Sequence, residues 1–290
     1  MTRKGMMKMR YDIHNKEMFR NQIKNNFLKR LVFRIDFSGL ISSDIEKYIE
    51  KVRPFISKEG YKKFGEENAN NISVDIANPN EIKSSNRVEK IYIFEDENNK
   101  SIKISNTFII FDVDMENNPT MFYNYLPLIS TMIDNLKELN YIFFERIGLR
   151  KLNSCLLLKD AKLNDYFTEK VFCKFMENTF TTDIADVFMF TNEIVDNYRT
   201  NYHRQIQLGK IIENNKPECA SQIILDIDCY IDDKSSFNKL IKQVEASKML
   251  KVFNDQIYDI YIESLQKEFI DKLMQDKFND ENIRGVIANV

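Results

Sequence analysis

The sequence predicts an α+β fold in which helices back one large antiparallel sheet. Apolar and polar residues alternate along several segments, as is typical of half-buried strands. Apolar stripes at helical spacing fall between these segments, and residues 236 to 277 contain no glycine or proline, which predicts a long C-terminal helix. The first half follows the order β-α-β-β-α-β, which is typical of a ferredoxin-like arrangement.

The elements of the first half follow from local patterns. Residues 28 to 39 alternate, with Leu31 and Phe33 on one face of a strand. A capping box at residues 43 to 46 begins a helix that Pro54 closes. Residues 60 to 86, rich in Asn, Glu and Lys, predict an irregular surface segment. The remaining elements are expected as strands at 88 to 96 and 101 to 114, a helix at 120 to 139 and a strand at 141 to 158.

The second half has weaker patterns. Residues 161 to 178 predict a helix, and residues 193 to 212 and 219 to 231 predict antiparallel strands. The C-terminal helix carries an apolar stripe from Tyr258 to Leu273, and we expect a break near Asn254. This helix should pack across the sheet.

Length and charge bound the domain organisation. A chain of 290 residues that is 43% hydrophobic can bury a substantial core. We expect a basic arm at residues 1 to 25 and one α+β domain at 26 to 290, with two lobes meeting near 158 as an alternative.

Nine Lys or Arg against two acidic residues make the first 30 residues strongly basic. Such an arm can attract nucleic acid or an acidic protein, although a solvated leader is the simpler interpretation.

Several classes of protein are disfavoured by what the sequence lacks. No apolar stretch approaches the roughly 20 residues that span a bilayer, so we expect a cytoplasmic protein without membrane contact. The four cysteines show no ligand spacing, which predicts reduced thiols. The two histidines are His14 and His203, so a histidine-based metal site or catalytic triad would depend on His203. We expect no cofactor.

One segment, IILDIDCYIDD at residues 223 to 233, is unusually acidic. Residues two apart on a strand share a face, so Asp226, Asp228 and Asp232 point one way while Leu225 and Ile227 point the other. The favoured interpretation is a half-buried antiparallel strand. A Mg or Mn site is the alternative, because these cations bind oxygen ligands.

A basic strand, RIGLRKLN at residues 146 to 153, is the counterpart of the acidic one. Arg146, Gly148 and Arg150 share a face, and the glycine leaves the two guanidiniums unshielded. The pair could bind phosphate, carboxylate or nucleic acid. Pairing with Asp226 and Asp228 across the sheet is the favoured interpretation.

A third polar stretch, NYRTNYHRQIQLG at residues 197 to 209, interleaves tyrosines with arginines. Such a mixture can stack nucleic-acid bases. On a strand, however, Arg199 and His203 face away from Tyr198, Tyr202 and Arg204, so an ordinary polar edge strand is favoured. The candidate binding residues of the polar sheet face are Arg146, Arg150, Arg199, Arg204, Asp226 and Asp228.

The chain resembles a family of proteins at four places in order. These are LKRLVFRIDF (28 to 37), RIGLR with Asn153, ILDID (224 to 228) and FIDKL (269 to 273). They resemble an uncharacterised, sporadically distributed family of bacterial cytosolic proteins, over most of the chain from about residue 25. The family commonly has Tyr where Lys151 stands here, and a His in its last helix that this chain lacks. The resemblance implies a fold and no established activity, while the patchy distribution suggests defence-linked operons.

Known catalytic signatures are missing from the sequence: it has no GxxxxGK[ST], GxGxxG, HExxH or GxSxG. We therefore expect no catalytic residue and no bound metal, and lean away from an enzyme. The favoured hypothesis is a non-catalytic subunit that binds a partner effector protein in a bacterial antiviral or toxin-neutralising system; its oligomeric state is open. One alternative is a nucleic-acid-binding protein that uses the basic arm and the arginines. Another is a metal-dependent nuclease centred on Asp226 and Asp228.

Overall fold

The computed structural model describes most of the chain. The described ranges are residues 16–75, 83–116, 119–158, 161–172, 186–195, 197–213 and 215–288. Residues 1–15, which form most of the expected basic arm, lie outside these ranges.

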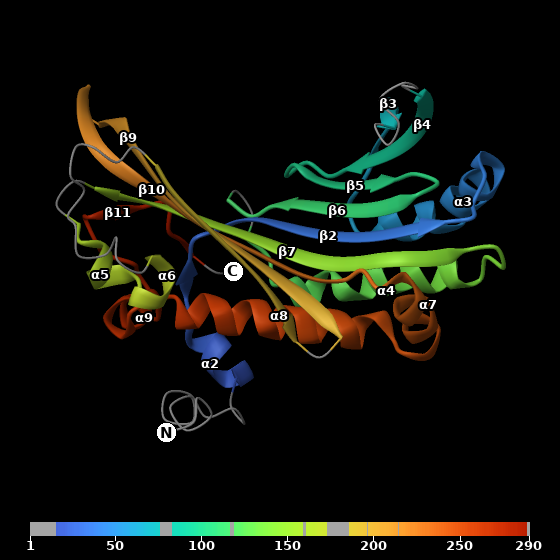
Figure 1. The fold of residues 1–290 in the computed structure, drawn as a ribbon. Helices are drawn as coiled ribbons and strands as arrows, with labels where there is room; N and C mark the ends of the chain where they lie inside the picture. The colour runs from blue at the N-terminus through green and yellow to red at the C-terminus, as the bar shows by residue number, and fades with distance from the viewer. Residues whose placement is uncertain are drawn as a thin grey trace.

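A large antiparallel sheet of ten strands dominates the described residues (Figure 1). Its order is β3-β4-β5-β6-β2-β7-β10-β9-β8, and β11 pairs with β7 beside this path. A two-stranded sheet joins β1 to β12 near the chain ends. The strands are β1 (Asn25–Asn26), β2 (Leu28–Ser38), β3 (Lys63–Asp75), β4 (Lys83–Glu95), β5 (Lys100–Ile104), β6 (Phe108–Asp114), β7 (Phe143–Leu158), β8 (Asp186–Val195), β9 (Tyr198–Glu213), β10 (Lys216–Ile231), β11 (Ile283–Arg284) and β12 (Ile287–Ala288).

The main helices lie on one side of the large sheet, which we call the packed face (Figure 1). There α8 contacts β7 and β10, and α4 packs between α3 and α8. The helices are α2 (Lys16–Gln22), α3 (Ser42–Lys58), the 3-10 helix η2 (Phe122–Asn124), α4 (Leu126–Lys137), α5 (Leu163–Tyr166), α6 (Glu169–Phe172), α7 (Lys234–Gln243), α8 (Ala246–Glu263) and α9 (Lys267–Leu273). Among the described helices, none combines the length and apolar character that a membrane crossing requires. The expected α+β fold, a large antiparallel sheet backed by helices, is confirmed.

The strand alternation seen in the sequence decides which residues enter the core. In β10, Leu225, Ile227 and Cys229 are fully buried on the packed face, whereas Asp226 and Asp228 point to the opposite face, which we call the open face. Phe33 of β2 and Phe111 of β6 are opposite each other and pack edge to face, with ring centroids 5.9 Å apart. Each fully buried side chain of this size contributes roughly 1.5 to 3 kcal/mol, so the packed face supplies most of the stabilisation.

The first half contains more strands than the sequence predicts. Residues expected to be irregular form β3 and the first four residues of β4, and β3 and β4 make a long antiparallel pair. Asn-rich segments have low strand propensity, so the backbone ladder with β4 overrides the local preference here. The expected strand at 101 to 114 is divided into β5 and β6 by a turn in which Ser105 Oγ accepts hydrogen bonds from the backbone N–H groups of Thr107 and Phe108.

The expected C-terminal helix is three helices, and the break near Asn254 was wrong, because Asn254 is buried in the middle of α8. One break falls at Val244 and Glu245, between α7 and α8, and the second at Ser264 to Gln266, where the chain pairs with residues 166 to 168. Leu265 and Phe167 form an antiparallel bridge, and the Gln266 N–H donates to the Tyr166 carbonyl at 2.9 Å. Contacts between distant segments therefore set this boundary.

The same contact interrupts the helix expected at 161 to 178. The chain forms the short helices α5 and α6 on either side of Phe167, and residues 173–185 lie outside the described ranges. Likewise, the segment expected as one strand at 193 to 212 belongs to two strands: it contains the end of β8, a turn and most of β9. The division into lobes near residue 158 stays a prediction; that residue ends β7, which lies between β2 and β10.

Candidate functional site

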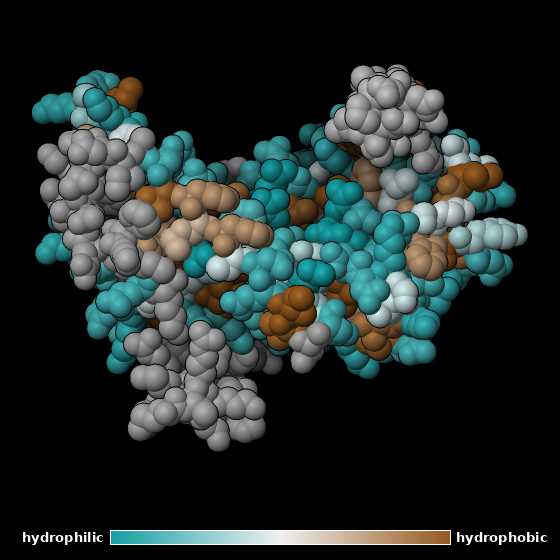
Figure 2. Space-filling model, viewed as in Figure 1, coloured by the Kyte–Doolittle hydropathy of each residue, from teal (hydrophilic) through white to brown (hydrophobic). Residues whose placement is uncertain are grey.

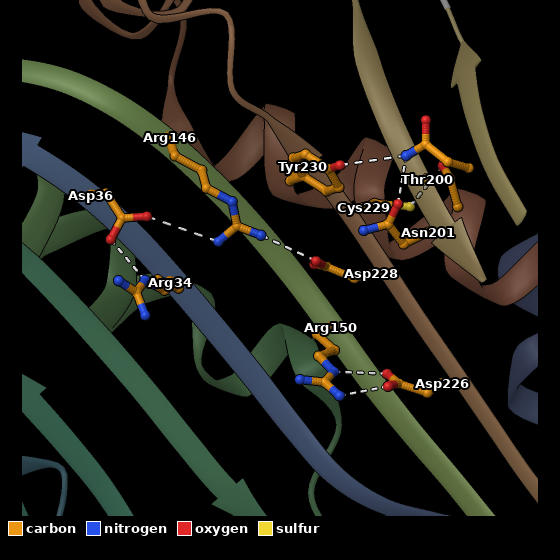
Figure 3. Close-up of polar contacts among 11 residues, drawn as sticks. Arg34, Asp36, Arg146, Arg150, Thr200, Asn201, Asp226, Asp228, Cys229 and Tyr230 are labelled. Carbon is orange, nitrogen blue, oxygen red and sulfur yellow. Dashed lines mark hydrogen bonds and ion pairs between the residues drawn. The ribbon is translucent and has the colours of Figure 1, made fainter. Parts of the chain in front are cut away.

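A line of ion pairs crosses the middle strands on the open face. Arg150 of β7 donates two hydrogen bonds to Asp226 of β10, from Nε at 2.7 Å and from Nη2 at 2.5 Å. Arg146 donates from Nη2 to Asp228 at 3.1 Å. Figure 3 shows both guanidiniums pointing from β7 toward the aspartates of β10. The pairing expected from the sequence is confirmed, and the two-bond contact is the stronger geometry for an arginine and a carboxylate.

Further pairs extend this line in both directions. On β2, Arg34 donates to Asp36 at 2.7 Å, and Arg146 Nη1 lies 3.9 Å from the same carboxylate. Arg30 binds Asp112 of β6, and on the other side Arg199 of β9 donates to Asp232 at 3.1 Å. We call these paired residues the charged ladder; its members are Arg30, Arg34, Arg146, Arg150, Arg199, Asp36, Asp112, Asp226, Asp228 and Asp232.

Gly148 gives the charged ladder room to form. A Cβ at this position would lie 3.1 Å from the Tyr230 Cβ, 3.3 Å from Arg146 Nη2 and 3.4 Å from Asp228 Oδ1. The Arg146 guanidinium also lies over the Tyr230 ring, 4.8 Å from its centroid. The missing side chain therefore lets Arg146 cross the strand and reach Asp228.

Burial and nearby charge shift the pKa of Asp228 in opposite directions. Burial raises the pKa of Asp228, and the nearby Arg146 and Arg150 guanidiniums lower it by a smaller amount. Asp226 is the more deeply placed partner, with a side chain 9% exposed against 53% for Arg150. In the pairs of Asp226 and Asp228 the aspartate is thus the more buried partner, and the guanidinium reaches toward solvent.

The acidic strand does not form a metal centre in the part of the chain that the structure describes, where no group of three or more His, Cys, Asp or Glu side chains could hold an ion. Asp226, Asp228 and Asp232 are each bound to a different arginine. A cation would have to displace these guanidiniums before it could bind.

Arg204 was expected on the polar sheet face, and this placement was wrong. In β9 it is opposite Leu225, so it points to the packed face and is only 6% exposed. Its guanidinium lies over the Tyr202 ring at 4.8 Å, and Nη2 donates to Thr191 at 3.4 Å. The physical reason is the two-residue period of the strand, which places Arg199 and Arg204 on opposite faces.

An aromatic cluster at the sheet edge was missed by the sequence reasoning. His203 of β9 is opposite Phe190 of β8, and its ring makes edge contacts with Phe190 at 4.5 Å and Phe188 at 5.6 Å between centroids. Phe188 and Phe190 are 62% and 49% exposed, and Ile194 farther along β8 is 67% exposed. The alternation of Phe188 and Phe190 was the available signal. We call Phe188, Phe190 and His203 the aromatic edge.

The open face is concave, because the sheet rises at both ends away from the helices (Figure 1). In Figure 2 the surface is hollowed between these ends; hydrophilic side chains cover most of its middle, and hydrophobic ones gather toward the end where β9 and β10 lie. A shallow cavity of about 390 Å³ lies at the ladder, lined in part by Arg34, Asp36, Arg146 and Asp232.

A second feature lies on the packed face. Lys151, next to Arg150 in β7, extends its amine into a mostly apolar pocket between the sheet, α2, η2 and α8. The amine donates to Asn254 Oδ1 at 2.6 Å. Burial, together with the positive charge of Arg20, lowers the pKa of Lys151 to about 7. This site was not predicted from the sequence.

Comparisons with known proteins give no relative. No protein-family model matches the chain, and no curated protein matches it. One solved structure, the S. pombe Pct1 RNA triphosphatase in complex with the Spt5 CTD, aligns over 90% of this chain and 98% of its own at 7% identity, with a TM-score of 0.17. A TM-score this low carries no argument about fold or function.

Proposed function

We propose that the protein is a non-catalytic subunit that binds a partner protein through its open face, with the aromatic edge as the anchor. The observation that carries this proposal is the concave open face, which the described helices leave bare, and on which charges are already paired and exposed aromatic side chains lie at one side. Non-obligate protein interfaces combine such apolar anchors with a polar surround.

The charge balance of the open face favours a protein over a nucleic acid. The strands β2, β6, β7, β9 and β10, with the residue that follows β10, present five arginines and six aspartates. These are Arg30, Arg34, Arg146, Arg150 and Arg199, and Asp36, Asp112, Asp114, Asp226, Asp228 and Asp232. Nucleic-acid affinity comes mainly from uncompensated cations that neutralise phosphates. Guanidiniums already bound to carboxylates provide little of that attraction.

The aromatic edge supplies the apolar contact that a protein partner needs. Phe188 and Phe190 project from β8, the last strand of the sheet, beside a row of polar side chains. Residues that dominate the binding energy of protein interfaces are few and often aromatic, and truncating one of them typically costs 2 kcal/mol or more. The edge of β8 also offers backbone groups to which a partner strand could add.

The similarity to a sporadically distributed bacterial family suggests the kind of partner. Genes with such a distribution are often found in mobile or defence-linked operons, where small subunits assist or neutralise a neighbouring effector. We propose an effector encoded nearby, in a cytoplasmic antiviral or toxin-neutralising system. This part of the proposal is based on analogy with the family and not on the residues.

The test is an affinity purification from the native host at moderate salt, with and without nuclease. The wild-type chain is compared with a Phe188→Ser/Phe190→Ser variant and with Ile212→Ser, which removes another exposed apolar side chain at the far end of β9. We expect a stoichiometric protein that survives nuclease, is lost in the double variant and is kept by the control.

Two results would contradict the proposal. Recovery of nucleic acid alone, released steeply as salt rises, would favour the nucleic-acid alternative and the basic arm. A protein partner retained equally by the double variant would show that the aromatic edge is not the anchor.

A further inference from the structure

The pocket around Lys151 lies on the packed face, so an inference from it does not depend on the proposed partner site. The pocket encloses about 140 Å³. Its apolar wall comes from the sheet, α2, η2 and α8 and includes Ile23, Leu28, Leu31, Met115, Phe122 and Ile257. A space of this size fits a molecule of a few non-hydrogen atoms.

We propose that this pocket binds a small, uncharged aldehyde or ketone with a short apolar chain, which the Lys151 amine holds as an imine. The site is built from three features: an amine directed into the pocket, a neighbouring guanidinium, and an apolar wall that matches a hydrocarbon chain.

The amine has the environment of a nucleophile. Lysines become nucleophilic when they lie in an apolar pocket or beside another cation, and Lys151 has both. Because its pKa is lowered to about 7, about half of the amine is neutral at neutral pH. Asn254 accepts one N–H at 2.6 Å and orients the group.

The Arg20 guanidinium is already bound to a carboxylate, which argues against an anionic ligand. Its Nη1 lies 2.6 Å from Asp255 Oδ1 and 2.8 Å from the Tyr123 hydroxyl, and the guanidinium lies over the Tyr258 ring at 4.3 Å. Although it is paired, Arg20 lowers the pKa of Lys151 by more than Asp255 raises it. The other titratable groups near the amine are Asp255, Tyr258 and Tyr261 of α8, Tyr123 of η2 and Cys229 of β10.

The chemistry needs no further reagent. The neutral amine nitrogen attacks the carbonyl carbon, the carbon–oxygen π bond opens, and one nitrogen proton passes to that oxygen to give a carbinolamine. A proton moves from nitrogen to the hydroxyl, water leaves, and the carbon–nitrogen double bond forms. The product is an imine and one water, and hydrolysis reverses the reaction with no change of oxidation state.

The experiment uses butanal and sodium cyanoborohydride with the full-length protein at pH 7, followed by peptide mapping. The reductant converts an imine to a stable secondary amine. Lys234 and Lys248, with side chains 60% and 69% exposed, are the comparators within the same molecule. We expect Lys151 to be labelled at least about tenfold faster, because an ordinary lysine of pKa near 10.4 is neutral in fewer than about one in a thousand molecules at pH 7.

A binding site differs from a merely reactive amine in its concentration dependence. We expect the labelling rate of Lys151 to reach a plateau as butanal rises, while the rates of Lys234 and Lys248 rise linearly. The pH midpoint of labelling should lie near 7 and move upward in Arg20→Gln, which removes the neighbouring positive charge. Lys151→Arg should lose the fast-labelled site.

Both decisive measurements use the wild-type protein, so they do not depend on the folding of a variant. Labelling of Lys151 no faster than that of Lys234 would overturn the proposal. So would a rate that stays linear in butanal, since it would show reactivity without a site.

Discussion

Arg150 and Lys151 are consecutive residues of β7 whose cationic groups project to opposite faces of the sheet. The Arg150 guanidinium binds Asp226 on the open face, and the Lys151 amine binds Asn254 of α8 on the packed face. Because β7 lies between β2 and β10, both contacts are held by strands on either side. One short segment therefore positions both of the sites proposed above.

The pair of Arg150 and Asp226 should respond unequally to removal of either partner. Arg150→Met leaves the carboxylate of Asp226, only 9% exposed, without its partner, and we expect a loss of about 1 to 3 kcal/mol in the free energy of unfolding. Asp226→Asn leaves a half-exposed guanidinium that water can solvate, so the loss should be smaller. Urea unfolding of both variants measures the difference.

Lys248→Met, at an exposed pair with Glu245, is the control and should change stability by less than about 0.5 kcal/mol. Equal losses at Arg150 and Asp226 would contradict the assigned asymmetry.

Gly148→Ala should destabilise the protein by about 1 kcal/mol. The added Cβ would meet Tyr230 at 3.1 Å and press on the contact between Arg146 and Asp228. Gly209→Ala is the matched control, because it lies in β9 and no atom of the described residues is within 4 Å of the new Cβ; it should stabilise by about 0.5 kcal/mol through the unfolded chain. Thermal melts of the two variants should thus shift in opposite directions; a shift in the same direction would mean that the ladder tolerates a side chain at 148.

Stability should rise with pH through the range in which Lys151 loses its proton. Its pKa is about 7 in the folded protein and near 10.4 in the unfolded chain, so the unfolded chain binds more protons between these values. This lysine therefore penalises folding fully below pH 7, and the penalty is relieved as pH rises toward 10, by up to about 1.4 kcal/mol per pH unit. The measurement is the difference in unfolding free energy between wild type and Lys151→Met at several pH values. A difference that does not change with pH would show that Lys151 titrates normally.

The described cysteines should differ sharply in reactivity. Cys155 and Cys229 are buried, and burial raises the pKa of both thiols, that of Cys229 to about 12. Cys219 is exposed. Brief iodoacetamide treatment at pH 7.5, with peptide mapping, should label Cys219 and reach the other two only after unfolding, because the thiolate is the reactive form. Labelling of Cys229 in the folded protein would mean that β10 opens locally.

The sequence predicts well those features that depend on local periodicity. Alternation alone assigned the faces of β10, and the positions of Arg146 and Arg150 sufficed to predict their pairing with Asp226 and Asp228. These predictions succeed because a strand has a period of two residues, so one buried residue determines the facing of its neighbours.

The remaining features depend on contacts between distant segments. The strand β3 forms from an Asn-rich segment because β4 offers it a backbone ladder, and the helix break after Ser264 forms because Phe167 pairs with Leu265. The pocket of Lys151 combines residues of α2, β7 and α8, which are more than a hundred residues apart. No local pattern carries that information.

The charged ladder also bears on how ten antiparallel strands find a single alignment. If β10 slipped by one residue against β7, Asp226 and Asp228 would turn toward α8 and Ile227 would turn to water. The same slip would separate each of these aspartates from its arginine on β7. Misaligned sheets would thus bury unpaired carboxylates at a cost of several kcal/mol. The acidic strand therefore penalises wrong alignments, so that during folding β10 and β7 should pair in one register only.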